Sequence, residues 1–242
     1  MGPFEMSILL ATVLLAAFIQ STTGFGFAIV CMAILPVFIP YGSAQLVAVI
    51  MSLVGNLIIV LRKRAHIQWK QVLLPAIFGA VGTVSGLLII KNSAPELYKR
   101  LLGVFLCLLA IWFLFFNDRV RIRGSARNGA LIGAVSGVCG GVFSINGPPM
   151  VIYYLSVFRD MDMYRATIQT YFLLMNAVNI SCRLLFDLVP AGSMTALLLA
   201  APMVVLGNLA GVRLADRIDP KKMKTCIYLF LALSGLYTAI TG

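Results

Sequence analysis

The two halves of this chain repeat one hydrophobic pattern. In each half, an apolar stretch with two glycines is followed by a short charged loop with a proline, and then by a second apolar stretch. A shift of 125 positions superposes identical residues: Leu73, Ala76, Gly82, Gly86, Pro95, Lys99, Phe105, Leu106 and Leu108 fall on Leu198, Ala201, Gly207, Gly211, Pro220, Lys224, Phe230, Leu231 and Leu233. Many secondary transporters are built from such duplicated units, with the substrate site between the repeats.

A chain this apolar is predicted to lie in a membrane. Hydrophobic residues make up 61% of it and charged residues only 11%, whereas a soluble domain carries roughly a quarter charged residues. Several apolar stretches approach or exceed the ~20 residues that cross a bilayer as a helix. The net charge of +11 comes from basic residues in short loops between these stretches, so we expect a lipid bilayer as partner and no nucleic acid.

Eight apolar units divide equally between residues 1–125 and 126–242. The first unit of each half is too long and too interrupted for a simple span, so each is predicted to be a re-entrant or broken helical hairpin. The other six are predicted to be single transmembrane helices, which makes this an all-α polytopic membrane protein. The predicted elements are hairpin 4–39 and helices 43–61, 71–90 and 97–116, then hairpin 128–157 and helices 167–186, 193–212 and 224–241.

The distribution of basic residues favours two halves of opposite orientation. If all eight units crossed the membrane, the two faces would share the lysines and arginines almost equally, which violates the positive-inside rule. If units 4–39 and 128–157 instead return to the side they enter from, one face receives most of them: Arg62, Lys63, Arg64, Lys70, Arg119, Arg121, Arg123, Arg127, Arg159, Arg165, Arg213, Arg217, Lys221, Lys222 and Lys224. The halves are then inverted repeats with these loops cytoplasmic; eight full spans with parallel repeats is the alternative.

The interruptions in the two hairpin units, near residues 20–27 and 137–149, are the predicted binding site. Irregular backbone at membrane depth is tolerated only where it is buried in protein or lines a wet cavity. A helix that restarts there presents free N–H groups with partial positive charge, and glycine lets a ligand approach the backbone. No acidic residue lies in the middle of a predicted span. Such a neutral, donor-rich site suits a compact anion.

Polar and small residues at the two interruptions are the candidate ligands, and Asn146 or Ser144 is expected to cap the second helix start or to face the ligand. Arg183 either attracts the anion or extends to the membrane surface near Asp187. Four other glycines are expected in helix packing: Gly82, Gly86, Gly207 and Gly211. The predicted substrate-binding residues are Gln20, Thr22, Thr23, Gly24, Phe25, Gly26, Gly140, Gly141, Ser144, Asn146, Gly147, Pro148, Asn176 and Arg183.

Three features together point to a known family: the repeated unit, the segment from Gly24 to Pro36, and the glycine-rich segment 137–149. On these features the chain resembles the TauE/SafE family of sulfite and organosulfonate exporters over nearly its whole length. The resemblance implies a multi-pass transporter of the bacterial plasma membrane. It also implies a small sulfur-containing anion as substrate, such as sulfite or sulfoacetate, moved by alternating access in the direction of export.

Other functions stay open at this point. The same hairpins would serve an anion channel, or an importer of another small carboxylate or oxyanion. A membrane sulfur-transfer protein using Cys31 or Cys139 is a further alternative, although the sequence shows no nucleophile and base that would act together. The five cysteines have no metal-binding spacing, so we expect no cofactor. Apolar outer faces permit a homodimer.

Overall fold

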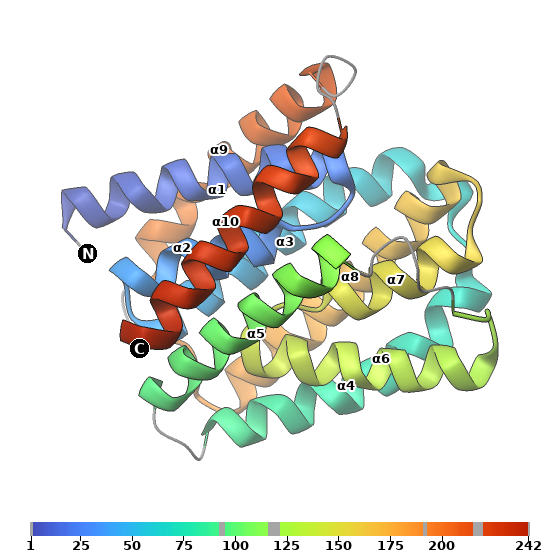
Figure 1. Cartoon of the computed structure of the whole chain (residues 1–242), viewed down its shortest axis with the longest axis horizontal. Coiled ribbons are helices and arrows are strands. Elements are labelled where there is room, and N and C mark those ends of the chain that lie inside the picture. The colour runs from blue at the N-terminus through green and yellow to red at the C-terminus, as the bar shows by residue number, and fades with distance from the viewer. Residues whose placement is uncertain (1, 92–94, 116–121, 191–192, 215–219, 242) are drawn as a thin grey trace.

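The part of the chain that the structure describes is built from helices. The computed structural model describes residues 2–91, 95–115, 122–190, 193–214 and 220–241. These residues form ten α-helices and a 3₁₀ turn, η1 (Arg64–His66), which confirms the all-helical prediction (Figure 1). The α-helices are α1 (Pro3–Thr23), α2 (Phe27–Phe38), α3 (Tyr41–Lys63), α4 (Trp69–Lys91), α5 (Pro95–Phe115), α6 (Ala126–Phe143), α7 (Gly147–Val157), α8 (Met161–Leu185), α9 (Ser193–Leu214) and α10 (Pro220–Thr241).

Length and hydropathy separate helices that can cross a membrane from helices that cannot. Among the described residues, five helices are long and apolar enough to cross: α1, α3, α4, α5 and α9. Since α1 has 21 residues, the first part of the predicted hairpin 4–39 is long enough for a full span rather than a shallow dip. In contrast, α2 has 12 residues and α7 has 11, well short of the ~20 that a crossing needs.

Each long apolar unit is divided into two helices by a short non-helical break. Between α1 and α2, Gly24 and Gly26 adopt φ angles of 84° and 106°, a backbone region that glycine enters without steric cost. Between α6 and α7, Ser144 adopts the left-handed conformation at the equivalent place, with a φ angle of 60°. After each break the second helix runs back along the first (Figure 1), so the two breaks lie inside the helical bundle.

Small residues allow the central helices to pack closely. On α6, Gly133, Gly137 and Gly141 recur every fourth residue, and a Cβ on any of them would overlap backbone atoms of α4. On the partner helix, Gly82 and Gly86 lie against α6 in the same way. The packing role expected for four glycines is confirmed for all of them: Gly82, Gly86, Gly207 and Gly211. Lipid offers helices little hydrophobic driving force to associate, so such close backbone contact is a main source of stability.

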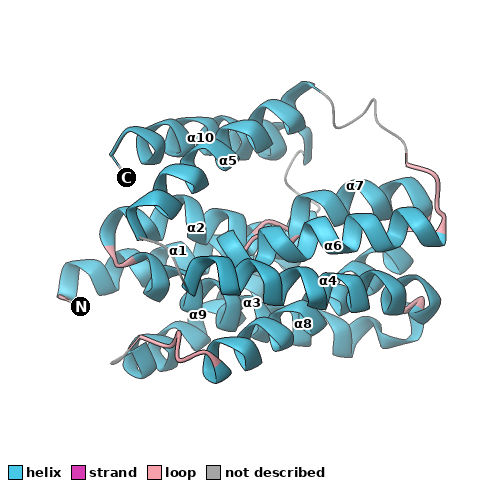
Figure 2. Ribbon diagram, turned by 90° about the horizontal axis from the view of Figure 1, so that it is seen from below, coloured by secondary structure: helices cyan, strands magenta, loops and turns pink. Residues whose placement is uncertain are grey.

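Three basic segments, residues 62–68, 122–125 and 158–165, meet at one end of the bundle, which we call the basic end. Lys63 forms an ion pair with Asp162, and the Ser156 hydroxyl accepts a hydrogen bond from the backbone N–H of Ile122 at 3.0 Å. The start of α1 and the end of α10 lie at the opposite end (Figures 1 and 2). Three other arginines of the predicted basic face lie outside the described residues: Arg119, Arg121 and Arg217.

Candidate functional site

The two breaks meet at a small cavity in the middle of the bundle. Its volume is about 30 Å³, and one water requires roughly 10–15 Å³ by the same measure, so it suits a ligand of a few heavy atoms. No side chain that lines it is charged. The residues of this central cavity are Gln20, Phe25, Gly26, Phe27, Ala28, Ile29, Ser52, Ser144, Ile145, Asn146, Gly147, Phe172 and Asn176.

Both short helices begin at the central cavity. The first intrahelical hydrogen bond of α2 is donated by Val30 to Gly26, so the N–H groups of Phe27, Ala28 and Ile29 have no partner within the helix. The start of α7 at Gly147 lines the same cavity. Two helix N-termini at one point concentrate partial positive charge there, which favours an anion without requiring a charged side chain.

Amide and hydroxyl groups complete the lining of the central cavity. Ser52 of α3 accepts a hydrogen bond from the Asn176 amide of α8 at 3.1 Å, and the buried Gln20 amide of α1 donates to Asn56 and to Gln169. The Oδ1 atom of Asn146 is buried without a protein partner. The cavity therefore has both hydrogen-bond donors and acceptors, as a protonated or partly protonated oxyanion needs.

Arg183 lies directly behind this lining. Its side chain is 1% exposed; the Nε atom donates to Asn179 at 2.7 Å, and an Nη atom lies 3.5 Å from the Ser144 hydroxyl. The ion pair between Lys63 and Asp162 is at the basic end, and Asp187 is not among the hydrogen-bond partners of the Arg183 guanidinium. The prediction that Arg183 extends to the membrane surface near Asp187 is therefore wrong. The guanidinium is buried, and only Ser144 lies between it and the central cavity.

Seven of the fourteen predicted site residues line the central cavity, and the others lie elsewhere. The Thr22 and Thr23 hydroxyls donate to backbone carbonyls of α1, both to Ile19 at 2.9 and 2.8 Å, so neither is a free donor at the cavity. The remaining five lie behind or beside the lining: Gly24, Gly140, Gly141, Pro148 and Arg183. Gly141 is a packing residue, because a Cβ there would come within 2.5 Å of a carbonyl oxygen on α4.

Of the two roles expected for Asn146 or Ser144, capping is wrong, whereas both residues line the central cavity. Asn146 is the residue before α7, yet its side chain makes no capping hydrogen bond. Ser144 instead ends α6 in a left-handed conformation. The Asn146 backbone carbonyl accepts a hydrogen bond from Ser136 at 2.6 Å. Its side chain is left to face Gly140, where a Cβ would overlap the amide.

Sequence reasoning missed other residues of the central cavity, notably Ser52 and Phe172. It also missed Gln169, which accepts from Gln20 at 3.1 Å and donates to the Gly24 carbonyl at 2.7 Å. Ser52 and Gln169 are buried polar residues within the predicted transmembrane helices 43–61 and 167–186. That burial of a polar group inside a membrane helix is the signal that would have singled them out.

A second, larger cavity lies on the other side of Gln20, toward the basic end. Its volume is about 320 Å³. We call it the basic vestibule, and it is lined by Gln20, Ser21, Gly24, Ile58, Ile59, Arg62, Lys63, Arg165, Gln169, Asn208 and Val212. Gln20 and its neighbours Asn56 and Gln169 thus form the layer of amides that separates the basic vestibule from the central cavity.

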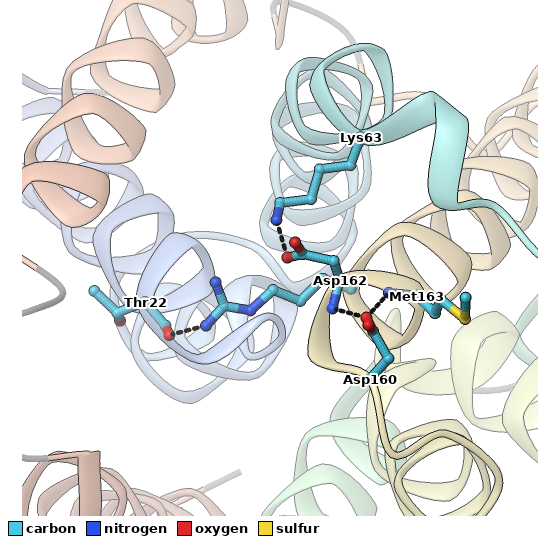
Figure 3. Close-up of polar contacts among 6 residues, drawn as sticks. Thr22, Lys63, Asp160, Asp162 and Met163 are labelled. Atoms are coloured by element: carbon cyan, nitrogen blue, oxygen red, sulfur yellow. Dashed lines mark hydrogen bonds and ion pairs between the residues drawn. The ribbon is translucent and has the colours of Figure 1, made fainter.

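Hydrogen bonds fix the mouth of the basic vestibule (Figure 3). Asp160 caps α8 by accepting from the backbone N–H groups of Asp162 and Met163 at 2.8 and 2.9 Å. Asp162 lies in the first turn of α8, before the apolar part of that helix. The hydrogen bond from Lys63 holds the pKa of the Asp162 carboxyl below its usual value. Arg165 donates to the Thr22 carbonyl at 3.4 Å, which places a guanidinium at the C-terminal end of α1.

Comparison with known proteins agrees with this architecture. The family model described as sulfite exporter TauE/SafE matches residues 9–238. The chain belongs to this family. One relative, the probable sulfite/organosulfonate exporter TauE of Cupriavidus necator (strain ATCC 17699 / H16), is 24% identical over 212 residues, which are 84% of this chain and 81% of that protein. No solved structure matches the chain.

Membership of the TauE/SafE family makes the chain a multi-pass membrane transporter and not an enzyme. The helices fit this assignment, since five of those described are long and apolar enough to span a membrane. Among the cysteines, Cys31 is fully buried in the core and does not line the central cavity. The described residues contain no cluster of three histidine, cysteine, aspartate or glutamate side chains that would hold a metal ion.

Proposed function

We propose that this TauE/SafE protein is a secondary transporter of a small sulfur-containing anion, sulfite or an organosulfonate, and that it works in the direction of export. The observation that carries the proposal is the central cavity. It has a volume of about 30 Å³, no charged side chain lines it, and the N-termini of α2 and α7 both lie at it. The Cupriavidus relative, which is named a probable sulfite/organosulfonate exporter, supports the substrate class. The membrane is proposed to be the bacterial inner membrane, with the basic end cytoplasmic.

The chemistry of the central cavity favours an oxyanion over a cation. A cation site requires carboxylates or converging carbonyl oxygens, and no acidic residue lines this cavity. Unpaired N–H groups at the start of α2, the Ser52 hydroxyl and the amides of Asn146 and Asn176 match the oxygens of an anion instead. Arg183 supplies positive charge from behind Ser144 without occupying the space. We propose that the predicted ligands that line the cavity bind these oxygens.

Alternating access is proposed to follow from two inverted repeats. Packing between the halves supports this relation: α1 lies against α9 just as α6 lies against α4, and α3 and α5 lie against their counterparts α8 and α10. In addition, Gln45 of α3 donates to the Val142 carbonyl at the end of α6, while Gln169 of α8 donates to the Gly24 carbonyl at the end of α1. Each half thus holds the broken helix of the other, an arrangement suited to rocking about the central cavity.

The experiment that tests the function is anion uptake by the purified protein in liposomes. The panel comprises radiolabelled sulfite, sulfate, sulfoacetate, isethionate, taurine, acetate and chloride. Saturable uptake of sulfite or a sulfonate is expected, with accelerated exchange when the same anion is loaded on the opposite side. A plain carboxylate as best substrate contradicts the substrate assignment, and flux that neither saturates nor exchanges indicates a channel.

A matched pair of serine variants tests the site. Ser52→Ala removes a hydroxyl from the central cavity, whereas Ser85→Ala removes one that is exposed on the outer face of α4 and bonded to Val81. Loss of one hydrogen bond to a charged ligand costs ~1.5–3 kcal/mol, so S52A is expected to weaken binding at least tenfold. Native affinity in S52A contradicts the placement of the anion at this cavity; S85A is expected to bind as the native protein does.

A further inference from the structure

The basic vestibule has features that the central cavity lacks. It is roughly ten times larger, and three cationic side chains line it, Arg62, Lys63 and Arg165, with no carboxylate in the lining. Asp162 lies beside it and is engaged by Lys63. Of the three cations that line the vestibule, Lys63 is thus paired, whereas Arg62 and Arg165 form no ion pair with any of the residues that the structure describes.

Arg165 is held in a way that leaves donors available. One of its terminal nitrogens donates to the Thr22 carbonyl over a long 3.4 Å, while its Nε–H is buried without a protein partner. Its stem packs beside Gly24, where a Cβ would lie 3.6 Å from the arginine side chain. The guanidinium is thus positioned by weak contacts at the end of α1, with one N–H that only a ligand or a solvent molecule can satisfy.

We propose that the basic vestibule is a second anion-binding site, in which Arg62 and Arg165 bind a small oxyanion group, such as sulfite or a sulfonate, on its way between the basic end and the central cavity. The proposal rests on the proposed function for the identity of the anion, and on the cavity and its arginines for the existence of the site. Guanidinium groups bind such anions through paired N–H donors.

The amide layer explains why the vestibule is separate from the central cavity. Gln20 lines both cavities and is tied to Asn56 and Gln169. An anion at Arg165 faces the side of Gln20 opposite to the central cavity.

The test is equilibrium binding of radiolabelled sulfite to protein in nanodiscs of neutral phosphatidylcholine. Two sites per chain are expected for the native protein. The double variant Arg62→Gln, Arg165→Gln is expected to lose one site, whereas Arg183→Gln weakens the other. Arg127→Gln removes the same kind of charge from an exposed position on α6 and is expected to keep both sites. Two unchanged sites in the double variant overturn the proposal.

Transport measurements separate this site from the proposed function. With sulfite supplied at the basic end, the double variant is expected to need about tenfold more sulfite for half-maximal uptake, threefold or so for each partly exposed charge, with a similar maximal rate. An unchanged half-saturating concentration counts against the vestibule while leaving the transporter assignment intact. Conversely, a protein that binds sulfite at the vestibule but transports no anion retains this site and refutes the function.

A lipid headgroup carries the same oxyanion chemistry as the soluble ligand, so binding is repeated in nanodiscs that contain phosphatidylglycerol. If the anionic lipid leaves both sulfite sites occupied, the soluble anion is the ligand. If it displaces sulfite from the site that depends on Arg62 and Arg165, oxyanion recognition by these arginines stands and the headgroup is its source. If it displaces sulfite equally from the double variant, the displaced site is not the vestibule.

Discussion

Arg183 offers the sharpest test of how the central cavity recognises charge. Its guanidinium is 3.5 Å from the Ser144 hydroxyl, and an anion that accepts a hydrogen bond from this hydroxyl lies ~2.8 Å further on. The two charges are then about 6 Å apart, which at an effective dielectric constant of ~20 corresponds to ~2.6 kcal/mol for a monoanion. Replacing Arg183 by Gln is therefore expected to weaken binding nearly a hundredfold, at about 1.4 kcal/mol for each factor of ten.

The charge of the ligand provides an internal control. For a dianion such as sulfate the lost free energy is about twice that for a monoanion such as isethionate, so R183Q is expected to change the preference between the two. A variant that merely disturbs packing lowers both affinities by the same factor. Binding is measured by competition with radiolabelled sulfite on purified protein, and Arg127→Gln is the control for loss of charge at an exposed position.

Folding of R183Q is measured in parallel by thermal unfolding. A buried charge with no acidic partner costs several kcal/mol of desolvation, so its replacement by the neutral, hydrogen-bonding glutamine is expected to leave the melting temperature unchanged or higher. Native affinity for both anions in a folded R183Q protein refutes the reasoning, because Arg183 then has no electrostatic influence on the cavity. An equal loss for sulfate and isethionate refutes it as well.

Four further variants probe the glycines and the amide layer. Gly140→Ala is expected to displace only the Asn146 side chain and so to lower sulfite uptake at a native melting temperature, whereas Gly141→Ala, which meets the backbone of α4, is expected to lower the melting temperature itself. Gly26→Ala forces alanine to a φ of 106°, a strain of about 1–3 kcal/mol, and is expected to lower both thermal stability and sulfite affinity. Gln169→Leu removes the donor to the Gly24 carbonyl and so weakens the amide layer. The rate of sulfite exchange from the basic end is expected to rise with sulfite concentration without reaching a plateau, and a plateau like that of the native protein contradicts the role of the amide layer.

Local signals in the sequence were sufficient to predict where the long apolar units break. Gly24 and Gly26 adopt backbone angles that other residues rarely enter, and Pro148 follows the start of α7, where no backbone N–H is needed. These preferences belong to the residue and its immediate neighbours, so they can be read without knowing the fold. The all-helical class follows in the same way from runs of apolar residues.

The identity of the cavity-lining side chains depends on packing and could not be predicted in full. Thr22 and Thr23 are predicted ligand donors because they adjoin the break, yet at a helix C-terminus their hydroxyls bond to the preceding turn, as threonine often does. Gly141 adjoins the second break but belongs to the packing surface shared with α4. Which way a residue near a break faces is decided by the neighbouring helix, and the sequence of one helix does not contain that information.

Ser52 shows what the internal repeat adds when it is applied residue by residue. In this region the two halves match at a shift of 124 positions, one fewer than the 125 that superposes the later helices, and this shift takes Ser52 to Asn176 and Gln45 to Gln169. The first pair meets directly across the central cavity at 3.1 Å, while each glutamine bonds to the end of the broken helix in the opposite half. Residues related by a twofold axis meet each other only when they lie on that axis, so the contact between Ser52 and Asn176 supports an axis through the cavity.

The two ends of the bundle that the proposed axis exchanges differ in charge, and this difference sets the end at which the proposed transport cycle attracts the anion. At the basic end, Arg165 accompanies Gln169 at the end of α1. At the other end, the equivalent place beside Gln45 is taken by Tyr41, which donates to the same Val142 carbonyl at 2.9 Å. A guanidinium attracts an anion before it reaches the cavity, whereas a neutral phenol does not. An exporter gains from this asymmetry, because the guanidinium at the basic end attracts the anion to the side from which it is exported.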